Sequence, residues 1–248
     1  PGGLDEARAV LKRIISGRSA DGVLLMNPSE DDALLADAVE AAFPHVLLGR
    51  SPMPGVNTVD NDNHRVALDA TAHLLSAGRR RLVLLNGDPH HTFARDRGAG
   101  FRAAVAGTTG ATGHVEYGLT TDEDGRSTVE RLLEEGHEID GIVAVADSLA
   151  VGALKALADR RLSVPAAVSV IGMNNDDMGA FTTPALSSVE LNAFDLGYAC
   201  GELLLAGIAG TAAGGERRIV GHGLVVRDSS LPTSRQSHDE AARGYGRG

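Results

Sequence analysis

The chain alternates short apolar runs with longer segments in which apolar side chains recur at helical spacing. Continuous short runs are typical of buried strands, and recurrence every third or fourth residue is typical of amphipathic helices. The apolar runs lie at Gly22–Met26, Val46–Leu48, Leu82–Leu85, Ile142–Val145, Val168–Met173 and Ile219–Val226. Helical spacing occurs at Leu4–Ile15, Asp31–Phe43, Asn63–Leu75, Arg95–Val105, Ser127–Leu133, Leu149–Leu157 and Phe194–Ile208. This repetition predicts an α/β protein with a mostly parallel sheet and helices on both faces.

Two of the predicted strands end abruptly at small polar side chains. The run Gly141–Ala146 stops at Asp147, where the segment DSLAVGALKAL begins with helical spacing. The run Val168–Met173 stops at Asn174 and Asn175, inside the segment SVIGMNNDDMGAFTTP. In an open parallel sheet, ligands sit at the carboxyl ends of the strands. We therefore expect a binding cleft lined by these two strand ends.

Composition narrows the class of protein further. The chain has 248 residues, 43% hydrophobic and 3% aromatic, which fits one large or two medium domains with a core of Leu, Val, Ile and Ala. The formal net charge is −10 and the longest basic run is Arg79–Arg81, a predicted solvated helix end, so the chain as given lacks the positive groove of a nucleic-acid site. No apolar run approaches the ~20 residues of a membrane span. The single cysteine, Cys200, excludes an internal disulfide and predicts a small buried thiol.

The candidate metal motifs have simpler explanations. Asp60–Asn63 begins like a calcium loop, but Arg65 stands at the sixth position and Thr71 at the twelfth, so a helix cap explains the segment better. His90 and His91 lie in a loop without a matching carboxylate or cysteine pattern. We interpret them as loop histidines that face water, and we expect neither a metal nor a cofactor.

No catalytic motif stands out. A glycine-rich dinucleotide loop, a P-loop and a nucleophile elbow are all missing from the sequence, which disfavours an enzyme. Arg97 is the most suggestive single residue, because a guanidinium near a strand end offers a rigid fork of donors to vicinal hydroxyls or a carboxylate. A surface ion pair with Asp96 explains Arg97 equally well from spacing alone.

Several motifs occur in an order that resembles a known family. They are Val59–Asn63, His73–Gly87, Arg97–Phe101, Asp147–Leu154, Val164–Gly172 and Thr183–Val189. Each motif alone is weak, but the ordered set at these intervals is similar to the effector-binding domain of lactose-repressor (LacI/GalR) family transcription regulators. The likeness runs from about residue 3 to residue 232.

The resemblance implies an α/β fold of the periplasmic-binding-protein-like type I class, with two doubly wound parallel-sheet lobes and a sugar-sized cleft. The expected N-terminal lobe is 1–60 plus 192–213, the C-terminal lobe is 61–191 plus 214–233, and 234–248 form a disordered tail. The resemblance also implies a cytoplasmic homodimer that responds to a small-molecule sugar and holds operator DNA through a separate N-terminal helix-turn-helix. Effector binding would shift the lobes and so change the affinity for DNA.

Carried over by position, the family's effector site points to eight residues of this chain. They are Asn27, Gly49, Arg50, Phe93, Arg97, Asp147, Asn174 and Asn192. Many members have Asp-Arg at Gly49-Arg50, Asn-Asp at Ala146-Asp147 and Phe-Asp-Asp at Met173-Asn174-Asn175. Where this chain departs from that pattern it resembles maltose-operon repressors, and this likeness implies a maltose-type glucoside as effector. An amide such as Asn174 both donates and accepts hydrogen bonds, which suits neutral sugar hydroxyls.

Two parts of the family pattern are missing from this sequence. The helix-turn-helix is absent, and the likeness begins at the family's second helix, without the opening strand–helix–strand of the first lobe. We expect the first lobe to be truncated, with an open or partner-covered sheet edge. The alternative function is a solute-binding protein for sugar import, which shares the fold; a helix-turn-helix or a signal peptide upstream would distinguish the two. An enzyme on this fold is the third reading.

Overall fold

The computed structural model describes residues 4–29, 32–211 and 213–231, and the predicted tail at 234–248 lies outside them. The chain forms two compact units. Unit 1 comprises residues 1–63, 90–95 and 192–221, and unit 2 comprises 64–89, 96–191 and 222–248. No described helix combines the length and apolar character needed to cross a membrane.

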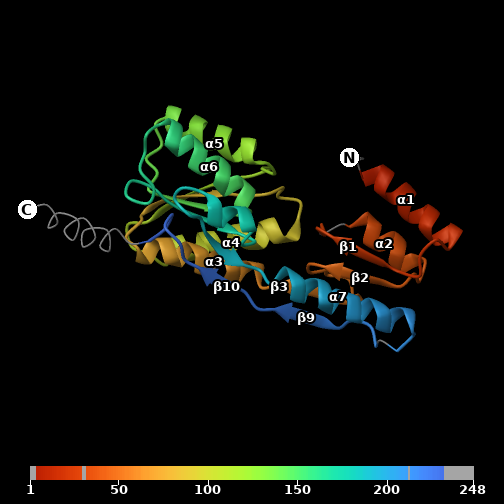
Figure 1. The fold of residues 1–248 in the computed structure, drawn as a ribbon. Helices are drawn as coiled ribbons and strands as arrows, with labels where there is room; N and C mark the ends of the chain where they lie inside the picture. The colour runs from red at the N-terminus through yellow and green to blue at the C-terminus, as the bar shows by residue number, and fades with distance from the viewer. Residues whose placement is uncertain (1–3, 30–31, 212, 232–248) are drawn as a thin grey trace, which may run out of the picture. The chain divides into compact units, whose positions relative to one another are not determined.

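Unit 1 is a four-stranded parallel sheet, ordered β1-β2-β3-β9. Alternate residues of β2 point to opposite faces, as in any strand. Val46 packs with Leu196 and Leu203 of helix α7, while Leu47 packs with Leu35 of helix α2. Both faces are thus covered (Figure 1). The elements are α1 (Leu4–Gly17), β1 (Val23–Met26), α2 (Ala33–Glu40), β2 (His45–Leu48), β3 (Thr58–Asn61), α7 (Ala193–Ile208) and β9 (Arg217–Val220).

Strand β1 forms one edge of this sheet. Among the described residues it pairs with β2 and with no other strand. Leu24 and Met26 are exposed, and α1, β1 and Leu34 line an apolar groove of about 390 Å³. Helix α1 packs mainly against α2. A bidentate ion pair joins them, in which Arg8 donates to both carboxylate oxygens of Asp37 at 2.8 Å. Strand β1 is therefore an edge strand of unit 1 within the described residues.

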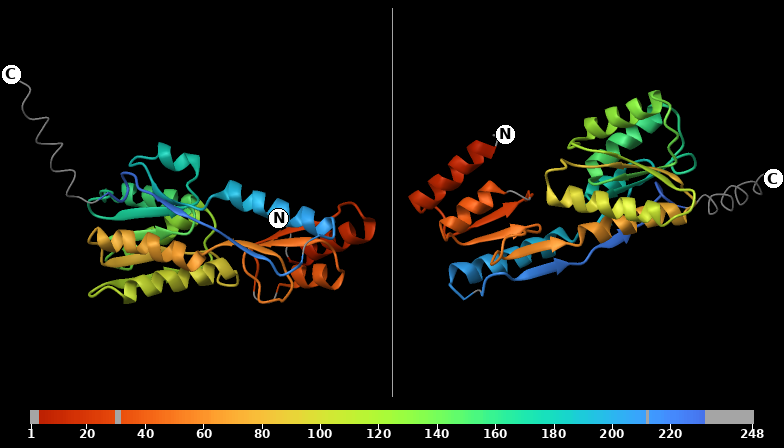
Figure 2. Two further views of the ribbon diagram at one scale, coloured as in Figure 1. Left: turned by 90° about the horizontal axis from the view of Figure 1, so that it is seen from below. Right: turned by 180° about the vertical axis from the view of Figure 1, so that it is seen from behind.

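Unit 2 is a six-stranded sheet, ordered β10-β8-β7-β6-β4-β5, in which β10 alone runs antiparallel, to β8. Helices α3 and α4 cover one face and α5 and α6 the other (Figure 2). The strands are β4 (Arg81–Leu85), β5 (Thr112–Glu116), β6 (Gly141–Ala144), β7 (Ser169–Met173), β8 (Ser187–Glu190) and β10 (Gly223–Val225). The helices are α3 (Asn63–Ser76), α4 (Thr92–Ala106), α5 (Asp122–Glu134), α6 (Asp147–Asp159) and the 3₁₀ helix η1 (Asp177–Phe181).

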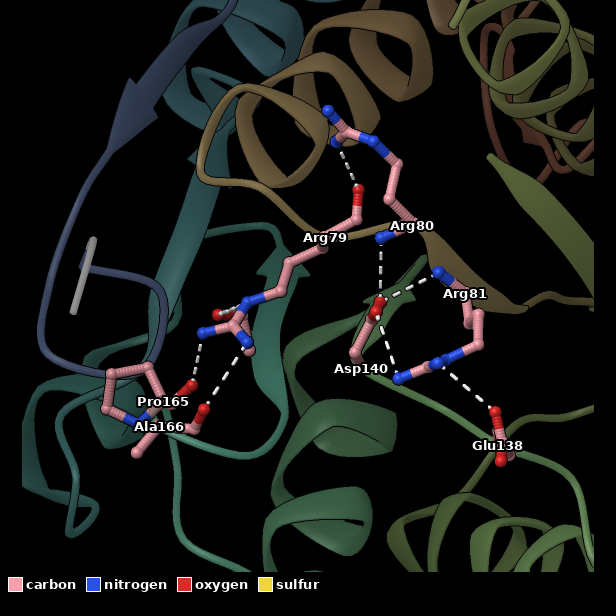
Figure 3. Close-up of polar contacts among 8 residues, drawn as sticks. Arg79, Arg80, Arg81, Glu138, Asp140, Pro165 and Ala166 are labelled. Carbon is pink, nitrogen blue, oxygen red and sulfur yellow. Dashed lines mark hydrogen bonds and ion pairs between the residues drawn. The ribbon is translucent and has the colours of Figure 1, made fainter. Parts of the chain in front are cut away.

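The arginines before β4 have a structural role at the amino end of this sheet. Asp140 accepts the main-chain N–H groups of Arg80 and Arg81, at 2.9 and 2.8 Å (Figure 3). The guanidinium of Arg79 donates to Ser169 Oγ at 2.9 Å and to the Pro165 carbonyl. The basic run is therefore not merely a solvated helix end, because it fastens the turn after α3 to β6 and β7.

All seven predicted helices are present, but the strands and lobe boundaries differ in informative ways. The predicted strand Ile219–Val226 is two strands, because β9 pairs with β3 in unit 1 and β10 with β8 in unit 2. Residues 214–221 accordingly lie in unit 1, where the sequence places them in the C-terminal lobe. Residues 90–95 lie in unit 1 for a similar reason, since Thr92 N donates to the Pro28 carbonyl at 2.9 Å.

Candidate functional site

Three predicted effector residues, Arg97, Asp147 and Asn174, follow β4, β6 and β7, which are neighbours in the sheet of unit 2. Arg97 stands on α4 and is 7% exposed. Its Nη1 donates to the main-chain carbonyl of Val145 at 2.9 Å. The guanidinium therefore lies against the carboxyl end of β6, two residues before Asp147.

Asp147 begins α6 and is completely buried, with 0% of its surface exposed. Its Oδ1 accepts the hydroxyl of Ser188 at 2.6 Å, and its Oδ2 accepts the main-chain N–H of Asp176 at 2.7 Å. Burial raises the pKa of this carboxyl to about 6, against the lowering effect of the Ser188 and Asp176 hydrogen bonds. Gly172 of β7 makes room for the carboxylate, because a Cβ there would meet Oδ1 at 2.0 Å.

Asn174 and Asn175 form the turn that follows β7. Both have positive φ, at 108° and 58°, a region in which Asn is one of the few non-glycine residues found routinely. Asn174 is exposed, and its N–H donates to the Val189 carbonyl at 2.9 Å. Asn175 is held through its side chain, which donates to Glu190 Oε2 at 2.9 Å and accepts from Arg227 at 2.7 Å.

Asn27, Gly49 and Phe93 gather at the carboxyl ends of β1 and β2 in unit 1. Asn27 follows β1 with a φ of 55°, and Gly49 follows β2 with a φ of 127°. A Cβ on Gly49 would meet the Pro28 ring at 2.5 Å, so this close approach requires glycine. The segment 90–95 docks on the same spot, through the Thr92–Pro28 hydrogen bond and a bridge between Ser29 and His91.

The loop histidines are not equivalent. His90 is exposed, as predicted for a loop residue facing water. His91 is half-buried and stacks on Phe93 with ring centroids 5.6 Å apart, so the prediction that it faces water is wrong. Its Nδ1 atom is buried and has no hydrogen-bond partner within the described part of the chain. Docking of the loop onto unit 1, which no local pattern reveals, accounts for the difference.

Arg50 and Asn192 complete the predicted set. Arg50 follows Gly49 and is half-buried. Asn192 begins α7 with a φ of 55°, and its Nδ2 donates to the Gly221 carbonyl at 2.8 Å, which ties the start of α7 to the end of β9. Asn27, Gly49 and Phe93 thus lie together at the carboxyl ends of the strands of unit 1.

Sequence reasoning missed the residues that support the turn after β7, namely Ser188 and Arg227. Ser188 is fully buried in β8 and joins Asp147 to the Asn175 N–H. Arg227 lies near the end of the described chain and donates to both Asn175 and the Leu186 carbonyl. A weak signal was available, since paired serines are unusual inside a buried strand. No local pattern indicates Arg227, because it contacts Asn175, which is 52 residues away in the sequence.

The two strand-end sets carry side chains that can form hydrogen bonds with a ligand. Amides at Asn27 and Asn174 can donate and accept, while the guanidinium of Arg97 supplies donors in a fixed plane. Within the described residues, no group of three or more His, Cys, Asp and Glu side chains could hold a metal ion. The arrangement can recognise hydroxyl-rich molecules by hydrogen bonds at strand ends.

A family model and the similar proteins all point to one family. Residues 71–230 match the periplasmic binding protein-like domain. The HTH-type transcriptional regulator CelR of Thermobifida fusca is 30% identical over 220 residues, which are 87% of this chain and 65% of CelR. An uncharacterized HTH-type transcriptional regulator in the aml 5′ region of Streptomyces limosus is 30% identical over 241 residues, covering 93% of this chain and 68% of that protein.

A solved structure agrees with these sequences. The complex of transcriptional regulator CelR with cellobiose superposes with a TM-score of 0.84 at 28% identity, covering 92% of this chain and 71% of that chain. The chain spans a little under two thirds of CelR's sequence, and its relatives are transcriptional regulators rather than enzymes. The chain therefore belongs to the periplasmic binding protein-like family, as the effector-binding domain of a LacI/GalR-type regulator.

Proposed function

We propose that this chain is the sugar-sensing and dimerisation domain of a transcriptional repressor. The observation that carries the proposal is the set of hydrogen-bonding groups at the strand ends of a fold that CelR shares in its complex with cellobiose. The proposed effector contacts come from eight residues. They are Asn27, Gly49, Arg50, Phe93 and Asn192 of unit 1, and Arg97, Asp147 and Asn174 of unit 2.

The effector we propose is a neutral disaccharide, and specifically a maltose-type glucoside. Asn174 occupies a strand end as an amide, so this position adds no negative charge that would need a cationic partner in the ligand. A site whose buried donors and acceptors match hydroxyls rejects ligands that lack them, because its own groups are then left unpaired. Sugars of the cellobiose and maltose type therefore fit better than anionic or purine ligands.

A homodimer contact belongs to the same proposal. The 3₁₀ helix η1 presents Met178 and Phe181 to solvent, at 53% and 87% exposure. Neighbouring apolar side chains on a surface are typical of protein contact sites. We propose that this helix contributes to contact with a second copy, and that an upstream helix-turn-helix of the whole protein holds operator DNA in the cytoplasm.

Titration of the chain by calorimetry tests the effector. Maltose and cellobiose serve as candidate ligands, and glucose 6-phosphate and guanine serve as an anionic and a purine comparison. Saturable binding of a neutral disaccharide, with maltose tightest, is the expected result. Tighter binding of guanine or of the phosphorylated sugar would contradict the proposed effector class, and tighter binding of cellobiose would contradict the maltose-type assignment alone.

A further inference from the structure

We propose that Asp147 is a positioning residue of the effector site: its buried carboxylate fixes the Asn174–Asp176 turn, and so sets where Asn174 meets the ligand. This inference rests on the proposed function for the ligand, but its structural half can be tested without one.

Both carboxylate oxygens of Asp147 are already used inside unit 2. Oδ1 accepts from Ser188 Oγ at 2.6 Å and Oδ2 accepts from the Asp176 N–H at 2.7 Å, while none of the residue's surface is exposed. Because none of this surface is exposed, a ligand hydroxyl would have to move the surrounding residues to reach Asp147. Asn174 is exposed two residues before Asp176, so a ligand can reach Asn174 where it cannot reach Asp147.

The turn is held through three consecutive main-chain N–H groups. That of Asn174 donates to the Val189 carbonyl at 2.9 Å, that of Asn175 to Ser188 Oγ at 3.0 Å, and that of Asp176 to Asp147 Oδ2 at 2.7 Å. Ser188 can accept from Asn175 in this direction because its own proton is donated to Asp147. The carboxylate therefore orients two of the three bonds, one directly and one through Ser188.

The backbone of the turn needs this support. Two consecutive non-glycine residues have positive φ, a conformation that persists only when the surroundings impose it. Gly172 shows that the surroundings are built around the carboxylate, since any side chain there would overlap Oδ1. Without an acceptor at Asp147, the turn would be free to relax to more ordinary backbone angles.

The first experiment measures amide hydrogen exchange by NMR on the full chain without ligand. The test variant is Asp147→Asn, which keeps the size of the side chain but replaces one acceptor oxygen by a donor. The matched control is Asp140→Asn, which makes the same change in a carboxylate that accepts from Arg80 and Arg81 at the opposite end of the strands. We expect the amides of Asn175 and Asp176 to exchange at least ~10-fold faster in Asp147→Asn and unchanged in the control.

Ser188→Ala provides a second route if Asp147→Asn folds poorly. It removes the hydroxyl that joins Asp147 to the Asn175 N–H, so it should speed exchange at Asn175 most. Wild-type exchange rates at residues 175 and 176 in both variants would overturn the proposal. Faster exchange confined to these turn amides, with the amides of β4 and β6 unaffected, supports it.

The second experiment is a double-mutant cycle on the affinity for maltose or cellobiose. A residue that acts only through Asn174 loses its effect once Asn174 is gone. We expect Asp147→Asn to weaken binding ~10-fold in the wild-type background and hardly at all in Asn174→Ala. Additive losses would show that Asp147 contacts the sugar itself and would overturn the positioning role. If neither sugar binds the wild type, the proposed effector fails, while the exchange experiment still decides what Asp147 does to the turn.

Discussion

Arg97 on α4 and Val145 after β6 are joined by a hydrogen bond of 2.9 Å from the guanidinium to the main-chain carbonyl. The bond fixes the plane of the guanidinium at a strand end, since an arginine's donors form a rigid fork. Arg97 is 7% exposed, so the group loses little freedom when it binds a ligand. A preordered donor of this kind is what a hydroxyl-binding site needs.

Replacing Arg97 should therefore remove much of the effector affinity. We expect Arg97→Ala to weaken sugar binding by about 2 kcal/mol, or roughly 30-fold, the scale of a hydrogen bond to a charged group. Arg97→Lys should restore little, because an ammonium lacks the planar fork. Arg102→Ala is the matched control, since Arg102 lies on the same helix, exposed, and donates to Tyr117 Oη at 3.1 Å. Equal affinities of wild type and Arg97→Ala by calorimetry would remove Arg97 from the site.

The helical spacing of apolar side chains predicts the helices well because each helix buries a stripe of side chains at regular intervals. The apolar runs, which indicate strands, do not reveal β3, β5 and β8, and the reasons are physical. Strand β5 is an edge strand whose first three residues are exposed, so it carries few apolar side chains. Strands β3 and β8 bury polar residues that bond to distant segments, as Ser187 does with Arg227.

The strand ends alone point to Asp147 and Asn174, whereas the unit 1 candidates Asn27, Gly49, Arg50 and Asn192 come only from the ordered motifs. A strand that stops at Asp147 marks a sheet edge, and the fold places that edge beside Asn174 as expected. What Asp147 bonds to depends on Ser188 and Asp176, which are 41 and 29 residues away. Contacts over such separations follow from the strand order and leave no local periodicity.

The buried carboxyl of Asp147 should make stability depend on pH. Its pKa is raised from the ordinary 3.8 to about 6, mainly by burial, so folding favours the protonated form. The contribution of this group to the free energy of unfolding is then greatest below pH 3.8 and falls as the pH rises to about 6. One pKa unit corresponds to ~1.4 kcal/mol, so the change is roughly 3 kcal/mol at most.

Asp147→Asn removes this titration, because an amide does not ionise. Urea unfolding at pH 4, 5, 6 and 7 should show wild type losing stability relative to the variant across this range, and levelling off above pH 6. A difference between the two proteins that stays constant with pH would show that Asp147 titrates near its ordinary pKa. Loss of the turn contacts can shift the stability of Asp147→Asn by a constant amount, so the test is how the difference between the two proteins changes with pH.

Close packing of α5 against α6 should make Gly152 indispensable. A Cβ there would meet the Asp122 carbonyl at 1.8 Å, and backbone cannot move aside as a flexible side chain can. We expect Gly152→Ala to lower the free energy of unfolding by ~2 kcal/mol or more, the scale of overpacking in a core. Gly201→Ala on α7 is the control, since nothing lies within 4 Å of its Cβ position.

Gly201→Ala should instead raise stability by about 0.5–1 kcal/mol, because alanine restricts the unfolded chain and favours the helix. Chemical denaturation should thus show that the same glycine-to-alanine substitution lowers the free energy of unfolding in α6 and raises it in α7. Similar losses in both variants would mean that the α5–α6 contact is not the cause.

The 3₁₀ helix η1 should form a contact between two copies of the chain. Phe181 is 87% exposed, and in a dimer it would bury apolar area worth ~25 cal/mol per Å². We expect Phe181→Glu to shift the chain from dimer to monomer in sedimentation velocity, since a charge at a buried contact is costly to desolvate. Phe194→Glu on α7 is the matched control, because Phe194 is similarly exposed, at 83%, but lies in unit 1 on another element. A dimer that survives Phe181→Glu and dissociates with Phe194→Glu would place the contact on α7 instead, and a wild-type monomer at all concentrations would reject the contact altogether.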